Sequence, residues 1–139
     1  MTIKALRIEP QDIPYIWHDV KPLIDKVLSQ TNGEMLSEDC LELLLTRNQI
    51  LFVGGDVEKD EIQSALVAEI IKYPRKKVFR IITWSTKSGH DYELWMDLFD
   101  TIEDYAKLQN CNLIEAWTRK GLAKKIKWDN EYSIITKHI

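Results

Sequence analysis

The fold is decided by the stretch VFRIITWSTKSGHDYELWMDLFDTIEDYAKLQNCNLIEAW, which runs from Val78 to Trp117. Apart from Arg80, all residues from Val78 to Trp84 are β-branched or aromatic, which predicts a strand. A helix is predicted from about Asp91 to Asn110, because its apolar residues recur on one helical face. Leu113–Trp117 is predicted to be a second strand. A strand–helix–strand unit of this length predicts a parallel crossover within one sheet.

The segment before this unit predicts antiparallel strands. Gln49–Val53 and Ile62–Ile71 are short β-rich runs separated by a loop that contains glycine and charged residues. Tyr73-Pro74-Arg75 then forms a corner that leads into the strand starting at Val78. Three consecutive strands joined by such short connections pair in an antiparallel way.

Both ends of the chain extend this pattern. Ile3–Ile8 alternates apolar and polar residues, which predicts a strand. A helix is expected to follow from Ile13, to be broken or restarted at Pro22, and to continue to Leu28. A second helix is expected from its N-cap at Ser37 to Leu45. Towards the C-terminus, Arg119–Lys127 predicts a short basic helix and Tyr132–Thr136 a final strand.

The predicted order of elements is therefore β-α-α-β-β-β-α-β-α-β. It corresponds to a single α/β domain over residues 1–139, in which a mixed, mainly antiparallel sheet is flanked by helices on both faces. Trp95 and Trp117 are predicted to fill the contact between helix and sheet.

Composition excludes several classes of function. The chain has 139 residues, 19 basic and 22 acidic, for a net charge of −3, which disfavours a globally basic nucleic-acid binder. Cys40 and Cys111 alone form neither a disulfide framework nor a four-ligand zinc site. The histidines His18, His90 and His138 have no metal-ligand spacing, so we expect no metal site. No run approaches the ~20 apolar residues of a membrane span, and the N-terminus does not match a signal peptide.

A narrower pattern runs through the second half of the chain. Its elements are Tyr73-Pro74-Arg75, Glu93-Leu94-Trp95, Glu103, Ala106, Cys111 and Arg119-Lys120-Gly121. With this pattern, roughly residues 50 to 139 resemble small bacteriophage proteins related to the GNAT superfamily of acyl-CoA-dependent N-acetyltransferases. The resemblance implies the GNAT fold, a place in the host cytoplasm or the virion, and a phage structural or host protein as partner.

The acyl-CoA loop of that superfamily is only partly matched. Active members bind the pyrophosphate with a loop of the type R/Q-x-x-G-x-G/A, whereas residues 85–90 contain one glycine. Asp91 and Glu93, in the first turn of the following helix, would repel a phosphate. If acetyl-CoA binds, the expected contacts are Trp84, Ser85, Thr86, Lys87, Gly89 and Arg119.

The catalytic groups are also incomplete. Many members place a tyrosine acid in the pattern Y-x-x-x-G-F, but here Ala123 stands at the tyrosine position and Lys127-Trp128 replace Gly-Phe. Glu69 is the candidate base, because it lies within an apolar strand where burial would raise its pKa. The alternatives for Glu69 are an ion pair with a neighbour such as Arg80 and a carboxylate that points to solvent.

Two basic clusters are the remaining candidates for binding. One lies within residues 72–80 and the other within 119–127. The second cluster could bind a CoA phosphate, nucleic acid or an acidic protein, or could simply be a solvated helix face.

Two functions therefore remain open. The first is a GNAT-like protein with a degenerate acyl-CoA site that requires no cofactor and acts by binding a partner. The second is an N-acyltransferase that uses acetyl-CoA through an atypical cofactor loop.

Overall fold

The computed structural model describes residues 3–87, 92–117, 124 and 126–139, and the side chains of these residues except 92–95. The elements follow the order β1 (Ile3–Ile8), a 3-10 turn (Pro10–Asp12), α1 (Ile13–Leu28), α2 (Ser37–Leu45), β2 (Ile50–Asp56), β3 (Glu61–Lys72), β4 (Lys77–Thr86), α3 (Tyr92–Leu108) and β5 (Leu113–Ala116).

The strands form a single sheet in the order β1-β2-β3-β4-β5. The pairs β1–β2, β2–β3 and β3–β4 are antiparallel, and β4–β5 is parallel. The predicted mixed, mainly antiparallel sheet and the parallel crossover through α3 are therefore confirmed. Asn110, two residues after the end of α3, has a φ of 61°, in the left-handed region that ends many helices.

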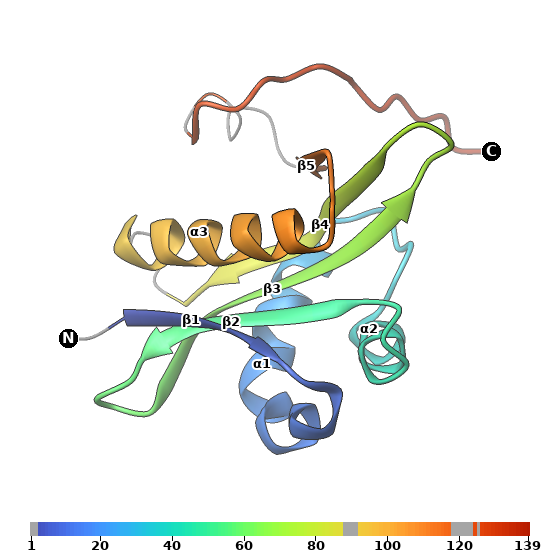
Figure 1. Ribbon diagram of the computed structural model, residues 1–139. Coiled ribbons are helices and arrows are strands. Elements are labelled where there is room, and N and C mark those ends of the chain that lie inside the picture. Colours follow the sequence, from blue (N-terminus) through green and yellow to red (C-terminus); the bar gives the residue numbers. More distant parts are fainter. Residues whose placement is uncertain (1–2, 88–91, 118–123, 125) are drawn as a thin grey trace.

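Helices cover both faces of this sheet (Figure 1): α3 lies on one face, and α1 and α2 lie on the other. Alternate residues of β2, β3 and β4 point to opposite faces, so the sheet contributes to two separate cores. On the α1 side, Leu51 and Val67 are fully buried. On the α3 side, Phe52 and Phe79 pack with Leu98 and are fully buried as well. Each such side chain contributes roughly 1.5–3 kcal/mol.

Helix α1 continues through Pro22, contrary to the prediction of a break. Val20, Leu23 and Ile24 are buried on both sides of the proline, so the helix is stabilised by packing on the sheet. That packing outweighs the roughly 3 kcal/mol cost of an internal proline.

The N-cap of α2 was also predicted one residue too late. Leu36 is the N-cap, and its backbone N–H donates to the Asp39 carboxylate at 3.0 Å. Ser37 is instead the first residue of α2 and is buried.

The predicted final strand at Tyr132–Thr136 is wrong, because residues 128–139 adopt no regular secondary structure. Tyr132 and Ile135 are 87% and 93% exposed. β-branched residues give a segment the capacity to form a strand, but a strand also needs a neighbour for its backbone hydrogen bonds. The predicted basic helix Arg119–Lys127 lies largely outside the described residues.

Trp117 is not a core residue, contrary to the prediction, and is 65% exposed. Ile114 and Ala116 pack on the α3 side, so the alternation of β5 turns Trp117 to the opposite face. The side chain of Trp95 lies outside the description.

Candidate functional site

The two parallel strands pair over a short distance only. β4 and β5 are in register from Val78 opposite Leu113 to Ile81 opposite Ala116. β4 then continues to Thr86, beyond the last residue of β5. Thr83 pairs with Val67 and Ile81 with Ala68, so Ile82 is an extra residue that forms a β-bulge. The bulge therefore begins where the pairing with β5 ends.

An aromatic stack occupies the α3 side of this region. We use that name for Trp84 of β4, Phe99 of α3 and Trp128. The ring centroids of Trp84 and Phe99 are 5.0 Å apart, and those of Phe99 and Trp128 are 5.5 Å apart. All three side chains pack against the α3-side core. Trp84 is therefore held by packing at the end of β4.

The described cofactor-binding candidates do not form one exposed anion site. Ser85 and Thr86 belong to β4 rather than to the predicted loop, and both residues are buried. Lys87 follows directly and forms an ion pair with Glu61 at 3.8 Å. Lys26 of α1 donates from Nζ to the backbone carbonyl of Thr86 at 3.1 Å. The other two candidates, Gly89 and Arg119, lie outside the described residues, so their cofactor roles stay predictions.

Glu69 lies apart from these residues. It is half-buried on β3 and pairs in the ladder with Arg80, whereas Trp84 pairs with Leu66. Glu69 lies three positions after Leu66 in β3, a distance of about 10 Å at 3.3 Å per residue. Because successive side chains of a strand alternate between its faces, an offset of three positions puts these two side chains on opposite faces. Arg80 forms its ion pair with Glu115, at 2.6 Å, and not with Glu69. The structure thus places Glu69 away from the other site candidates, and its catalytic role stays a prediction.

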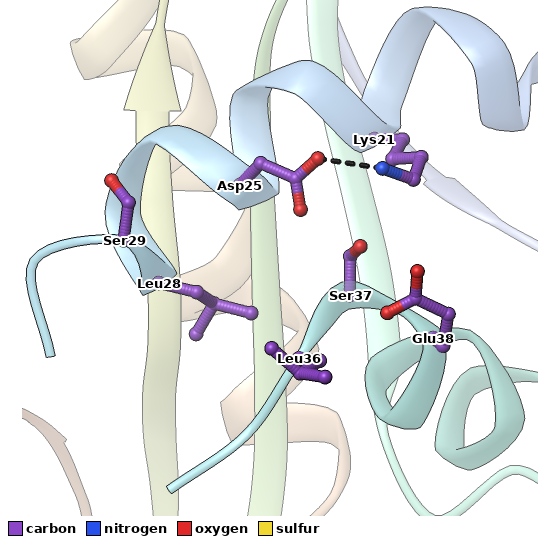
Figure 2. A pocket seen from close by; sticks show the side chains of 7 residues that line it. All are labelled: Lys21, Asp25, Leu28, Ser29, Leu36, Ser37 and Glu38. Atoms are coloured by element: carbon purple, nitrogen blue, oxygen red, sulfur yellow. Dashed lines mark hydrogen bonds and ion pairs between the residues drawn. The ribbon is translucent and has the colours of Figure 1, made fainter. Parts of the chain in front are cut away.

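The structure contains a pocket between α1 and α2 that the sequence did not predict. Its volume is about 350 Å³ and it lies on the face opposite α3 (Figures 1 and 2). Lys21 Nζ is 2.8 Å from Asp25 Oδ2, and hydrogen bonds from Lys21 and Ser37 lower the pKa of Asp25. The lining residues are Lys21, Asp25, Leu28, Ser29, Leu36, Ser37 and Glu38.

The pocket is lined by one cation and two carboxylates. Figure 2 shows the ion pair of α1 opposite Ser37 and Glu38 of α2. The hydrogen bond and charge of Asp25, together with the charge of Glu38, raise the pKa of Lys21. The only sequence signal for this pocket was the i, i+4 spacing of Lys21 and Asp25, which is common on exposed helix faces.

Two further features, a metal site and a membrane-spanning helix, are absent from the residues that the structure describes. Among them, no group of three or more histidine, cysteine or acidic residues could hold a metal ion. No helix within the same part of the chain is long and apolar enough to cross a membrane.

The chain was compared with known proteins by sequence and by structure. No protein-family model and no curated protein matches its sequence. In structure, it is similar to an aminoglycoside acetyltransferase from an uncultured soil metagenomic sample, with a TM-score of 0.73 and 15% identity over 99% of this chain and 95% of that one. A GNAT family acetyltransferase from Staphylococcus aureus gives 0.72 and 15%, over 100% of both chains.

A third similar structure is a ribosomal-protein-alanine N-acetyltransferase from Brucella melitensis, with a TM-score of 0.71 and 10% identity over 99% of both chains. At these identities the similarity concerns the fold. It extends over nearly the whole chain, including the sheet order and the helices on both faces. The predicted α/β fold is confirmed, and the chain has the fold of the GNAT acetyltransferases.

Proposed function

We propose that this chain uses the GNAT fold to bind a protein partner and that its acyl-CoA site is closed. The observation that carries the proposal is the aromatic stack. Trp84 lies on the part of β4 that extends beyond β5, where an acyl-CoA arm would enter between the two strands. Its ring packs on Phe99, which packs on Trp128. The arm could enter only if this packing were disrupted.

The polar groups near the end of β4 support the same conclusion. A pyrophosphate site needs exposed N–H groups or cations directed at one point. Here Ser85 and Thr86 are buried, Lys87 is paired with Glu61, and the Thr86 carbonyl accepts a hydrogen bond from Lys26. These described residues do not fit the cofactor, so we derive no acyl-transfer step through them.

The C-terminal segment, residues 128–139, provides a surface for a protein partner. Tyr132, Ile134 and Ile135 are 87%, 61% and 93% exposed. Exposed aromatic and β-branched residues suit the addition of a strand to the edge of another sheet. We infer that this segment becomes ordered when it pairs with the partner. By resemblance to the small bacteriophage proteins, we expect a virion component or a host protein, and hence a place in the virion or the host cytoplasm.

The test compares three forms of the full-length chain as bait for purified candidate partners and for extract of the producing cells. The wild-type chain should retain a defined protein, and the Ile134→Lys/Ile135→Lys variant should lose it. Leu108→Lys is the matched control, because Leu108 is 78% exposed but lies at the end of α3. Retention of the same proteins by all three forms would contradict the proposal.

An active N-acyltransferase is the second candidate, and the end of the β4–β5 pairing at Ile81, directly before the bulge at Ile82, favours it. In this alternative acetyl-CoA is the acyl donor and Glu69 is the base. The test measures release of the free CoA thiol in the presence of a panel of amines. Amine-dependent release that Glu69→Gln lowers at least tenfold would establish the enzyme. The absence of release for every amine would support the binding function.

A further inference from the structure

The tip of the β3–β4 hairpin concentrates positive charge in a protein whose net charge is −3. Residues 69–80 contain five cations and one acid. Lys72 and Lys77 are direct partners across the hairpin, and like charges in that position repel each other. Among the described residues, none of Lys72, Arg75, Lys76 and Lys77 forms an ion pair. An anionic ligand would relieve this repulsion.

Two exposed aromatic rings lie on the face that carries Arg80, opposite the face to which Lys72 and Lys77 point. Tyr73 and Trp117 are 46% and 65% exposed. Arg80 holds both: its Nη2 donates to the Tyr73 hydroxyl at 2.7 Å, and its guanidinium carbon lies 4.6 Å from the centroid of the Trp117 ring. Glu115 fixes Arg80 in turn, through the 2.6 Å bond from Nε. The two rings are thus oriented before any ligand binds.

Backbone hydrogen bonds keep the cations and rings at a fixed spacing. Tyr73 N donates to the carbonyl of Lys76 at 2.8 Å, which closes the turn of the hairpin. Lys77 N donates to Asn112 Oδ1 at 2.8 Å, and Asn112 N donates back to the Lys77 carbonyl at 2.7 Å. This reciprocal pair ties the hairpin to the segment that leads into β5 and therefore to Trp117.

We propose that this surface, the hairpin patch, binds single-stranded nucleic acid. It consists of Tyr73, Arg75, Lys76, Arg80 and Trp117, whereas the alternation of β3 and β4 turns Lys72 and Lys77 to the α3 face. Lysine and arginine side chains neutralise phosphates, and exposed aromatic rings stack on unpaired bases. Arg80 lies over one face of Trp117, and the exposed remainder of the ring offers a base its stacking surface. In a duplex the bases already stack on each other, so the rings favour a single strand.

The hairpin patch is separate from the end of β4 that holds the aromatic stack. Arg80 lies in the first half of β4, on the face opposite α3, whereas Trp84 packs on the α3 side. A test of the proposed nucleic-acid site therefore gives a result that depends neither on acyl-CoA binding nor on the C-terminal segment.

The test is fluorescence anisotropy of labelled 12-nucleotide dT and rU strands and of a 12-base-pair duplex, titrated with the full-length protein. We expect both single strands to bind more tightly than the duplex. With the two unpaired cations Arg75 and Lys76, log K should fall with log salt at a slope of about −1.4, which is about sevenfold between 50 and 200 mM NaCl.

Variants of the hairpin patch distinguish the contribution of ring stacking to the affinity from the contribution of charge. Trp117→Leu should weaken single-strand binding about tenfold without changing the salt slope, and Trp117→Phe should restore most of the affinity. Lys76→Gln should reduce the steepness of the salt slope by about 0.7. Lys59→Gln is the matched control, since Lys59 is exposed in the β2–β3 loop, and it should change neither quantity.

Three results would overturn the proposal. The first is the absence of oligonucleotide binding at 50 mM NaCl. The second is equal affinity for duplex and single strand together with no effect of Trp117→Leu. The third is equal loss of binding in Lys59→Gln and Lys76→Gln. Binding of an acidic protein at the hairpin patch, with no oligonucleotide bound, would likewise replace the proposal by a protein interface.

Discussion

Gly55 lies beside a second irregularity of the sheet, at which the register between β2 and β3 shifts. A Cβ atom at this position would overlap with the backbone carbonyl of Glu61 on β3. Gly55→Ala should therefore lower the free energy of unfolding by about 1–3 kcal/mol, as overpacking does elsewhere. Urea denaturation measures this change. Gly33→Asn is the control, because nothing lies within 4 Å of a Cβ there and asparagine tolerates the positive φ of 86°.

Cys40 couples stability to pH. Its thiol is buried, donates to Gln49 Oε1 at 3.1 Å, and has its pKa raised by burial from 9.0 to about 12. The unfolded chain ionises this thiol at a lower pH than the folded chain does. The contribution of the protonated Cys40 thiol to the free energy of unfolding is therefore fully present below about pH 9 and is lost as the pH rises towards 12.

At pH 10 this effect should reduce the free energy of unfolding by about 1 kcal/mol relative to pH 8. Urea denaturation at both pH values checks the effect, and Cys40→Ala should remove the part that depends on Cys40. An identical pH dependence in the wild type and the variant would show that Cys40 does not carry the effect.

At the scale of elements, the C-terminal segment should contribute little to stability. Residues 131–139 are all exposed and adopt no regular secondary structure. Deleting them should change the free energy of unfolding by less than about 0.5 kcal/mol, as is usual for exposed positions. A loss of more than about 2 kcal/mol in urea denaturation would mean that the segment pairs with the sheet in solution.

The elements also show what the sequence could predict. Strongly periodic segments such as α3 and β4 were found within a few residues of their observed bounds, because each has one apolar face or a continuous buried run. The strand at Tyr132–Thr136 could not be judged in this way. Its pattern indicates the capacity to pair, but the presence of a pairing partner is a property of the tertiary structure.

The site residues illustrate the same limit. Trp84 was expected at the end of a strand and among the cofactor contacts, but its packing on Phe99 and Trp128 joins residues that are distant in the chain. Glu69 and Arg80 are partners on adjacent strands, but the ion pair that was one alternative for Glu69 does not form. The choice of Glu115 as the partner of Arg80 depends on the parallel pairing of β5 with β4.

At the scale of the whole molecule, two regions of β4 have different surroundings. The first half, paired with β5, carries the hairpin patch on one face. The second half, beyond Ile81, ends in the aromatic stack on the other. The described elements thus follow the order of the GNAT fold, and we propose that packed side chains close the region in which an acyl-CoA would bind. The central claim is that a chain with the GNAT fold has a closed acyl-CoA site.

Calorimetric titration of the full-length protein with acetyl-CoA and with CoA tests that claim most directly. A closed site predicts no binding at millimolar ligand for the wild-type chain. Reversing charges within Arg119–Lys127 provides a control for non-specific attraction of the CoA phosphates. Micromolar binding of acetyl-CoA by the wild-type chain would contradict the account and would favour the N-acyltransferase.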